Sequence, residues 1–264
     1  MIDLHAHILY GLDDGAEDRE MMLNMFKIAA EDGIRKIVAT PHHICGANQY
    51  DAQTLDKRYD EAVEMIKSNG IDIELYKGSE VFLDEYVPDS IKNGTAPTLA
   101  GTRYVLVELP MLGFPKQTES ILYRILCDGY IPVIAHVERY ADIQKDIGIL
   151  KGFIEMGCLS QVNATSINGT AGRKVQETVK TIVTCSMAHL VSSDCHSDRR
   201  RSPRLKAAFE TVRTWLGDEK AEKIFDRNPQ SVLKNEAVDV DEPVIIQKKR
   251  FFNFKIPHKL PWGV

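Results

Sequence analysis

The chain alternates short apolar runs with longer stretches of helical period, and this alternation constrains the fold more than any other feature. Amphipathic stretches cover residues 18–32, 53–69, 117–128, 143–156 and 171–184. The runs expected to form strands are "MIDLHAH", "KIVATPHH", "IELYKGSEVF", "YVLVELP", "YIPVIAHVER", "LSQVNATS" and "HLVSSDCH". Strands that alternate with helices indicate a parallel sheet with crossover helices, so the sequence predicts an α/β fold.

Local signals mark where several helices begin or end. Glycines suited to a helix C-terminus follow four of the stretches, and they are Gly33, Gly70, Gly129 and Gly157. Ser202 and Pro203 predict the N-cap and first turn of a helix that reaches about residue 216. Asn228 and Pro229 predict the start of another short helix.

Composition excludes several classes of protein. The 264 residues carry a formal net charge of -5, so no basic excess indicates nucleic acid as a partner. The sequence has neither a basic leader nor a run of about 18 apolar residues, so we expect a cytoplasmic protein without a membrane span. The five cysteines include no Cys-x-x-Cys pair, which favours reduced thiols over a disulfide framework or a cysteine zinc site.

Side chains of the types that bind metal ions stand at the ends of six of the seven predicted strands. They are His5, His7, His42, His43, Glu80, Glu108, His136, Asp194 and His196. In a barrel of parallel strands, the carboxyl ends of all strands meet on one face, where active sites are built. We therefore expect residues from both ends of the chain to meet at a single site.

The N-terminal histidines also have a structural interpretation. Residues two apart in a strand point to the same side, so His5 and His7 can reach one ion, although such pairs are often structural. The segment Asp13-Asp14-Gly15 is typical of a solvated turn. Its position just after the two histidines makes Asp14 a ligand candidate.

The buried acids admit a second interpretation too. Glu80 and Glu108 each close an apolar run, where a lone carboxylate is costly unless it is paired or bound to a cation. A structural ion pair with Arg139 or Arg103 is the alternative, and His136 could be a core histidine. The common position of all these residues at strand ends favours metal binding.

Mixed imidazole and carboxylate ligands without thiolate suit Mn, Fe or Zn. The ligand candidates are more than one ion needs, so two or three ions bridged by a carboxylate fit the count. Such clusters polarise phosphoryl oxygens and lower the pKa of bound water. Arg139 and Arg201 could hold phosphate oxygens beside the ions. Arg199 and Arg200 instead fit a solvated basic loop.

The segment "CHSDRRRS" also allows a different phosphatase chemistry. Cys195 and Arg201 have the Cys-x5-Arg spacing of cysteine phosphatases. The segment has no glycine that would let the backbone wrap a phosphate, and Asp194 just before the cysteine disfavours a thiolate. We therefore expect Cys195 to pack away from Asp194 and His196.

The motifs "DLHAH", "ATPHH", "GSEVF", "LVELP", "PVIAHVER" and "SSDCH" resemble, in order and spacing, those of the polymerase and histidinol phosphatase (PHP) superfamily. More narrowly, they look like its bacterial branch of manganese-dependent tyrosine phosphatases that regulate capsule and exopolysaccharide synthesis. The resemblance implies an α/β fold, a distorted (β/α)7 TIM-like barrel in a single domain over residues 1–235. Residues 236–264 would then form a C-terminal basic-aromatic extension.

The resemblance also implies how the site is assembled from three divalent ions, with Mn expected and Fe or Zn as alternatives. The first ion takes His5, His7, Glu80 and Asp194, the second takes Glu80, Glu108 and His136, and the third takes Asp14, His42 and His196. Arg139 and Arg201 match phosphate-binding arginines, and His43 is a further substrate-binding candidate. Asp14 and Glu108 stand where histidinol phosphatases usually carry histidine, which favours the tyrosine phosphatase branch.

The expected function is hydrolysis of phosphotyrosine on a bacterial tyrosine kinase of exopolysaccharide or capsule synthesis, or on another phosphoprotein. A metal-bridging hydroxide would attack phosphorus in line, while Arg139 and Arg201 hold the nonbridging oxygens. The sequence offers no convincing general acid beyond the candidates His43 and Asp198. Three alternatives stay open: a phosphatase of a small phosphomonoester such as histidinol phosphate, an amidohydrolase, and a catalytically silent metal-binding regulator of a kinase.

The segment 236–264 changes from acidic to basic and interleaves aromatics with lysines. Its aromatic residues include Phe251, Phe252, Phe254 and Trp262. The favoured interpretation is a strap packed on the barrel or a frayed end. The alternative is a peripheral contact with acidic lipid or with a membrane-bound kinase.

Overall fold

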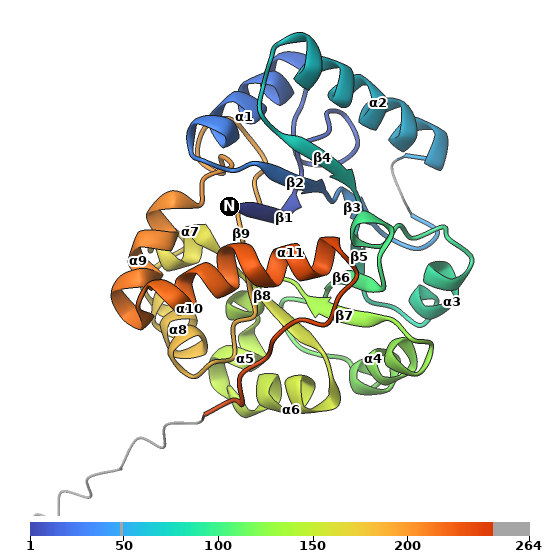
Figure 1. Ribbon diagram of the computed structural model, residues 1–264. Helices are drawn as coiled ribbons and strands as arrows, with labels where there is room; N and C mark the ends of the chain where they lie inside the picture. The colour runs from blue at the N-terminus through green and yellow to red at the C-terminus, as the bar shows by residue number, and fades with distance from the viewer. Residues whose placement is uncertain (48–49, 245–264) are drawn as a thin grey trace, which may run out of the picture.

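A computed structural model of the protein describes residues 1–47 and 50–244 (Figure 1). All the strand pairs found within these ranges are parallel. The strands are β1 (Ile2–Ala6), β2 (Lys36–Ala39), β3 (His42–His43), β4 (Glu74–Lys77), β5 (Glu80–Phe82), β6 (Tyr104–Glu108), β7 (Ile131–Ile134), β8 (Leu159–Asn163) and β9 (Leu190–Ser192). The predicted α/β class is confirmed.

Two of the predicted strands are each divided into a pair of short strands. Pro41 separates β2 from β3, since proline has no amide hydrogen to donate to a neighbouring strand. Gly78 lies between β4 and β5, where a Cβ atom would come within 2.9 Å of Val38 Cγ1. The nine described strands therefore occupy the seven positions expected from the sequence.

The strands curl into a distorted barrel. One sheet has the order β1-β2-β4, and the other has the order β3-β5-β6-β7-β8-β9. A parallel bridge between Ala6 and Cys195 joins the first strand to the segment after the last one. The backbone amide of His7 donates to the Cys195 carbonyl at 2.9 Å, and the amide of Asp194 donates to the His5 carbonyl at 2.9 Å. The expected barrel-like fold is thus confirmed.

Helices surround the strands (Figure 1). They are α1 (Arg19–Glu31), α2 (Ala52–Ser68), α3 (Val87–Lys92), α4 (Thr118–Cys127), α5 (Ala141–Lys145), α6 (Gly148–Met156), α7 (Ala164–Ile167), α8 (Arg173–Thr184), α9 (Lys206–Leu216), α10 (Asp218–Glu222) and α11 (Asn228–Leu233), with short turns η1 (Leu99–Gly101), η2 (Val137–Arg139) and η3 (Lys223–Arg227). Side-chain caps start the two long N-terminal helices, because Asp18 accepts from the Met21 amide and Asp51 from the Thr54 amide, both at 2.8 Å.

The start expected for the helix after the last strand is wrong. Ser202 and Pro203 lie in the preceding loop, and α9 begins at Lys206. The Asp32 carboxylate, at the end of α1, accepts hydrogen bonds from the amides of Leu205 at 2.6 Å and Lys206 at 2.8 Å. A side chain more than 170 positions away in the sequence therefore caps this helix in place of the local serine.

The predicted helix over 143–156 is also divided in two. Asp146 is extended, with φ -140° and ψ 101°, and its side chain accepts from the Gly148 amide at 2.9 Å. An aspartate that bonds to the backbone two residues onward competes with helix continuation. The chain therefore turns between α5 and α6.

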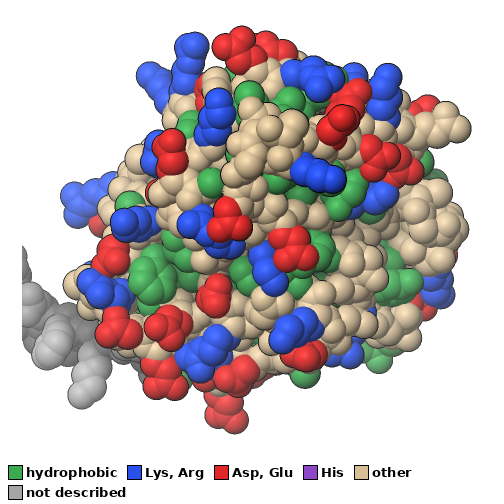
Figure 2. All heavy atoms as spheres, turned by 45° about the horizontal axis from the view of Figure 1, so that its top comes forward, with side chains coloured by type: hydrophobic (Ala, Val, Ile, Leu, Met, Phe, Trp, Pro, Cys, Tyr) green, Lys and Arg blue, Asp and Glu red, His purple; other side chains and the backbone are tan. Residues whose placement is uncertain are grey.

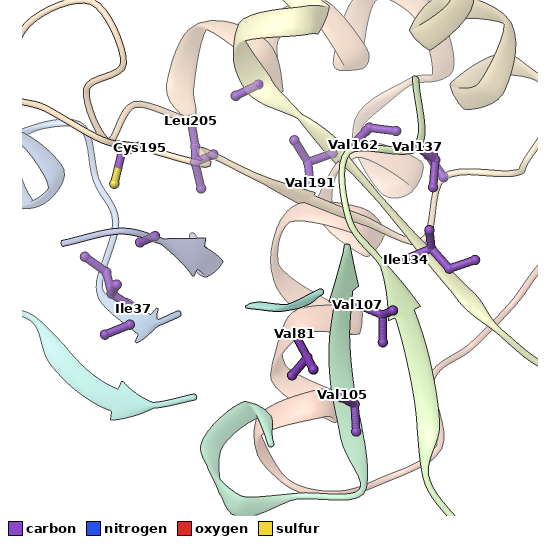
Figure 3. Packing of buried hydrophobic residues seen from close by; sticks show 14 of the residues in the cluster. Ile37, Val81, Val105, Val107, Ile134, Val137, Val162, Val191, Cys195 and Leu205 are labelled. Carbon is purple, nitrogen blue, oxygen red and sulfur yellow. The ribbon is translucent and has the colours of Figure 1, made fainter. Parts of the chain in front are cut away.

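Buried apolar side chains pack between the strands and the helices. Figure 3 shows part of this core, in which Val81, Val107 and Ile134 come from neighbouring strands. A second cluster joins Tyr104, at the start of β6, to Val232 of α11. In Figure 1, α11 lies across the end of the barrel at which β1 begins, so the opposite end is the one left for a site.

Residues 236–244 are held against the barrel by hydrogen bonds and ion pairs. Tyr104 donates from its hydroxyl to the Glu236 carbonyl at 2.5 Å, and Lys223 Nζ lies 2.9 Å from carboxylates of both Asp239 and Asp241. The aromatic residues Phe251, Phe252, Phe254 and Trp262 lie outside the described residues. No helix in the described part of the chain is long and apolar enough to cross a membrane.

Candidate active site

A single buried carboxylate lies at the centre of the cluster of ligand-type residues. Glu80, in β5, is 1% exposed. Its Oε2 lies 3.2 Å from Nε2 of both His5 and His7, and 3.1 Å from Nδ1 of His42. Its Oε1 lies 3.0 Å from Nε2 of His136. Four imidazoles from three strands, or from the residues just after them, therefore converge on one carboxylate.

Asp194 completes the inner part of the cluster. Its Oδ1 lies 3.5 Å from His5 Nε2 and 3.7 Å from His7 Nε2, while the two imidazole nitrogens are 3.1 Å apart. Asp194 has φ 51° and His136 has φ 33°, in the left-handed region that is costly for residues other than glycine. Strained backbone at two residues of one cluster is typical of functional sites.

The outer part of the cluster lies nearer the solvent. Asp14 Oδ1 is 3.4 Å from His42 Nε2 and 3.3 Å from His196 Nε2, and the Asp14 side chain is 65% exposed. Glu108 lies 3.6 Å from His136 Nε2 and 3.8 Å from His42 Nδ1. The structure thus brings all the predicted ligand residues into one cluster.

The donor atoms form three groups that could hold metal ions. In each group the donor atoms all lie within 4.8 Å of one another. The groups are His7, Asp14, His42 and His196; His5, His7 and Glu80; and His42, Glu80 and Glu108. Imidazole nitrogens together with carboxylate oxygens suit first-row divalent ions and zinc. The residues present therefore fit a cluster of more than one ion.

Charged neighbours shift the pKa values of several residues in the cluster. Burial alone would lower the pKa of His5, but the charges of Glu80 and Asp194 outweigh it and raise that pKa. Burial would raise the pKa of Glu80, yet the His5 charge and hydrogen bonds from His136 and other imidazoles hold it well below its usual value. Protonated histidines thus balance the carboxylates, a role that divalent cations would take over.

His196 differs from the other imidazoles. Burial and the positive charge of His7 lower the pKa of His196 to about 3. Its Nδ1 lies 3.1 Å from the Asp194 carbonyl. The neutral form keeps a lone pair on a ring nitrogen, which is the form that binds a metal ion.

Both predicted arginines reach the cluster through Asp194. Arg201 Nη2 lies 2.9 Å from Asp194 Oδ2, and Arg139 Nη1 lies 3.4 Å from the same oxygen. Both line a pocket of about 800 Å³ that also contains Met111 and Asn163. Two guanidinium groups therefore border the ligand cluster and an open pocket at once.

Asp13 was not predicted as a site residue, although its neighbour Asp14 was. Its Oδ2 lies 2.6 Å from His7 Nδ1 and accepts from the His42 amide at 3.0 Å, and its Oδ1 accepts from the Gly15 amide at 2.9 Å. A Cβ atom on Gly15 would lie 2.2 Å from the His7 carbonyl oxygen, so only glycine permits this turn. The expected acidic turn is present, and it fixes which His7 nitrogen faces the cluster.

Strand β8 corresponds to the one strand predicted from the sequence that has no ligand candidate, and it contributes two amide side chains. Gln161 Oε1 lies 3.1 Å from His5 Nδ1 and accepts from the His136 amide at 2.9 Å. Gln161 Nε2 donates to Asn163 Oδ1 at 2.8 Å, and Asn163 Nδ2 donates to Asp194 Oδ2 at 2.6 Å. Alternate polar residues in "LSQVNATS" were the signal that sequence reasoning left unused.

We expect Asn163→Leu to weaken metal binding about 10- to 100-fold, as is typical when a partner of a ligand is lost. The variant removes the donor to Asp194 with little change in side-chain size. Competition with a coloured chelator measures the affinity. Asn69→Leu, at the exposed end of α2, is the matched control and should bind metal as the wild type does. An unchanged affinity of the Asn163 variant would show that Asp194 does not need this bond.

The structure does not bring His43 to the arginines. His42 and His43 are adjacent in β3 and their side chains point to opposite sides, so only His42 faces Glu80. His43 instead lines a separate pocket with Cys45 and Tyr50. The expected substrate-binding role of His43 therefore finds no support in its position.

Cys195 packs as expected for a structural cysteine. It is fully buried, and Figure 3 shows it in the same apolar cluster as Ile37 and Leu205. Burial raises the pKa of the thiol, which disfavours the thiolate that nucleophilic attack requires. Asp198, which the sequence offers beside His43 as a candidate for the general acid, accepts a hydrogen bond from Asn24 Nδ2 at 3.2 Å.

Comparison with known proteins agrees with this geometry. The family model described as capsular polysaccharide synthesis, CpsB/CapC, matches residues 1–234. The tyrosine-protein phosphatase YwqE of Bacillus subtilis is 29% identical over 254 residues, which cover 96% of this chain and 100% of YwqE. The putative tyrosine-protein phosphatase CapC of Staphylococcus aureus is 30% identical over 95% of this chain and 98% of CapC.

Solved structures show the same relationship. A crystal structure from the pair YwqE of Bacillus subtilis and CpsB of Streptococcus pneumoniae, described as unique metal-dependent tyrosine phosphatases, has a TM-score of 0.90 at 29% identity. It covers 94% of this chain and 100% of the solved chain. Histidinol phosphate phosphatase from Lactococcus lactis shares only the fold, with a TM-score of 0.51 at 12% identity. This chain belongs to the CpsB/CapC family of capsular polysaccharide synthesis.

Proposed function

We propose that this chain is a metal-dependent protein-tyrosine phosphatase. The observation that carries the proposal is the junction of the ligand cluster with Arg139 and Arg201 at one carboxylate, Asp194. Metal ligands beside paired guanidinium groups suit a phosphoryl group, which needs both a cluster of cations and donors to its oxygens. The curated relatives named tyrosine-protein phosphatases support phosphotyrosine as the substrate.

We further propose three ions, with manganese favoured and iron or zinc as alternatives. His5, His7, Glu80 and Asp194 would hold the first, Glu80, Glu108 and His136 the second, and Asp14, His42 and His196 the third. The distances around Glu80 and Asp14 support this division. When bound, such ions polarise phosphoryl oxygens and lower the pKa of bound water to near neutrality.

The arginines would bind and orient the phosphate. Arg201 contacts both the carboxylate and the backbone carbonyl of Asp194, at 2.9 and 3.2 Å, so its guanidinium is held before substrate arrives. Donors held in place in this way need little rearrangement as charge develops on phosphate oxygens. A tyrosine phenolate, with a pKa of about 10, leaves without strong demand for a general acid. We assign no residue to that role.

The family description supports a phosphoprotein of capsule or exopolysaccharide synthesis as the physiological substrate. We propose a tyrosine-phosphorylated kinase of that system as the partner. The arginine pocket has a volume of about 800 Å³ and is also lined by Thr165 and Thr170, so it can admit a side chain carried on a protein surface. The rival candidates are a small phosphomonoester such as histidinol phosphate and a silent metal-binding regulator.

We expect kcat/KM for a phosphotyrosine peptide to exceed that for histidinol phosphate by about 10²-fold in the presence of manganese. The reason is that the large open pocket offers contacts to a peptide that a small substrate cannot use. Phosphate release measures both reactions under the same conditions. A preference for histidinol phosphate would replace the proposed substrate. Full metal occupancy without turnover of either compound would support the regulator.

A further inference from the structure

The pocket beside Arg139 and Arg201 is larger than a phosphate group requires. Its volume is about 800 Å³, and its lining includes Thr165, Thr170 and Val175 from the chain after β8. Pockets of roughly 300 to 1,000 Å³ enclose whole drug-sized ligands. The pocket therefore has room for residues on either side of a phosphotyrosine.

Arg200 gives this pocket a further positive charge. It lines the pocket together with Arg139 and Arg201, both of which contact Asp194. Among the ion pairs found within residues 1–47 and 50–244, none includes Arg200. The neighbouring Arg199 lies 3.9 Å from Asp198 and is not part of the pocket wall. Both arginines are exposed, as the solvated loop expected from the sequence implies, but of the two only Arg200 lines the pocket.

The loop that carries Arg200 is tied to the ligand cluster. The backbone amides of His196 and Ser197 both donate to the Arg201 carbonyl, at 2.8 and 3.1 Å. These bonds close the loop at its base, on the ligand candidate His196 itself. These bonds hold the backbone of the Arg200 loop beside the place where the phosphate would bind.

The positive character of the pocket is local. The chain carries a formal net charge of -5. On the face shown in Figure 2, lysine and arginine side chains are interspersed with aspartate and glutamate. In the pocket, by contrast, three arginines face a single acid, Asp194, whose charge already contacts two of them. Complementary charge of this kind gives specificity toward acidic partners.

We propose that Arg200 is a specificity-determining residue that selects phosphotyrosine segments with an acidic residue beside the phosphotyrosine. The inference rests on the proposed phosphatase function and names the class of sequence that this site prefers. The carboxylate of the flanking residue pairs with Arg200 at the pocket rim, while the phosphate lies deeper, against Arg139 and Arg201.

Three phosphotyrosine peptides that differ only in the flanking residues, glutamate, glutamine or lysine, test this inference. We expect kcat/KM to be about 5-fold higher for the glutamate peptide than for the glutamine peptide, and lower again for the lysine peptide. The difference should lie in KM rather than kcat, because the flanking pair contributes equally before and during reaction. It should shrink at about 1 M salt, where the Debye length falls to about 3 Å.

Charge reversal identifies the residue responsible. Arg200→Glu should reverse the order, so that the lysine peptide becomes the best of the three. Arg199→Glu, one position away and outside the pocket wall, should keep the wild-type order. Equal kcat/KM for the three peptides, or an order that Arg200→Glu leaves unchanged, would overturn the inference.

Failure of the proposed function gives a different result. If no phosphotyrosine peptide is hydrolysed, the phosphatase proposal falls, and fluorescence anisotropy of the same peptides bound to the protein tests the inference separately. The glutamate peptide should then still bind more tightly to the wild type than the lysine peptide, with the order reversed in Arg200→Glu. Equal dissociation constants would overturn the inference by this route as well.

Discussion

Exhaustive chelation should lower phosphotyrosine hydrolysis by at least about 10³-fold, and added manganese should restore it. Without cations, no Lewis acid polarises the phosphoryl oxygens, and the pKa of water is not lowered to supply hydroxide at neutral pH. Phosphate release from one peptide, measured before chelation, after it and after metal is returned, gives the result. Metal analysis of the same samples must show that removal was complete.

Cys195→Ala is the variant that separates the two phosphatase chemistries. Its thiol is fully buried in the apolar cluster of Figure 3, so we expect the variant to keep metal-dependent activity. The lost packing should cost about 1 kcal/mol of stability, which thermal unfolding measures. Activity that survives complete metal removal but disappears in Cys195→Ala would instead support the cysteine phosphatase chemistry of Cys195 and Arg201.

Glu80→Gln should lower kcat/KM by about 10³-fold. Glu80 contacts four imidazoles at 3.0 to 3.2 Å and is the carboxylate proposed to bridge two ions. Loss of the metal it would hold should remove about 4 kcal/mol of transition-state stabilisation, which corresponds to about three factors of ten in rate. The amide keeps the shape of the side chain but removes the charge that would bridge two ions. Steady-state kinetics and metal content measured together show whether the loss follows from loss of metal.

The same variant has a second readout in the metal-free protein. The pKa of Glu80 is held well below its usual value of 4.5, so its charge stabilises the fold at pH values above 4.5 and this contribution is lost only as the pH falls through the lowered pKa. At neutral pH, Glu80→Gln should therefore melt at a lower temperature than the wild type when both lack metal. Glu74→Gln, an exposed change in β4, is the matched control and should alter neither kcat/KM nor the melting temperature of the metal-free protein. Retained activity in Glu80→Gln would show that the bridging charge is not needed.

Much of the fold could be predicted from local patterns. Apolar runs and helical periods gave the seven strand positions and most helices, because each pattern depends on residues close together in the sequence. Where the structure departs, a distant contact or a single residue is the cause. Asp32 caps α9 from another helix, and Pro41 and Gly78 divide two strands.

The ligand residues could be predicted for a related reason. The carboxyl ends of parallel strands lie together, so ligand-type residues at strand ends had to meet once the barrel formed. The amide side chains of Gln161 and Asn163 could not be assigned in this way, because they do not bind metal themselves. Their role follows only from the distances to His5 and Asp194.

By itself, the sequence determined the parallel α/β architecture and the set of ligand-type residues that form the cluster in the barrel. Tertiary structure alone decided the direction in which each side chain points. His42 faces Glu80 while the adjacent His43 does not, and Arg200 lines the pocket while the adjacent Arg199 does not. The physical reason is that adjacent residues in a strand or a turn point their side chains in different directions. Periodicity and motif order indicate which residues are present, but the direction of each side chain depends on the folded backbone.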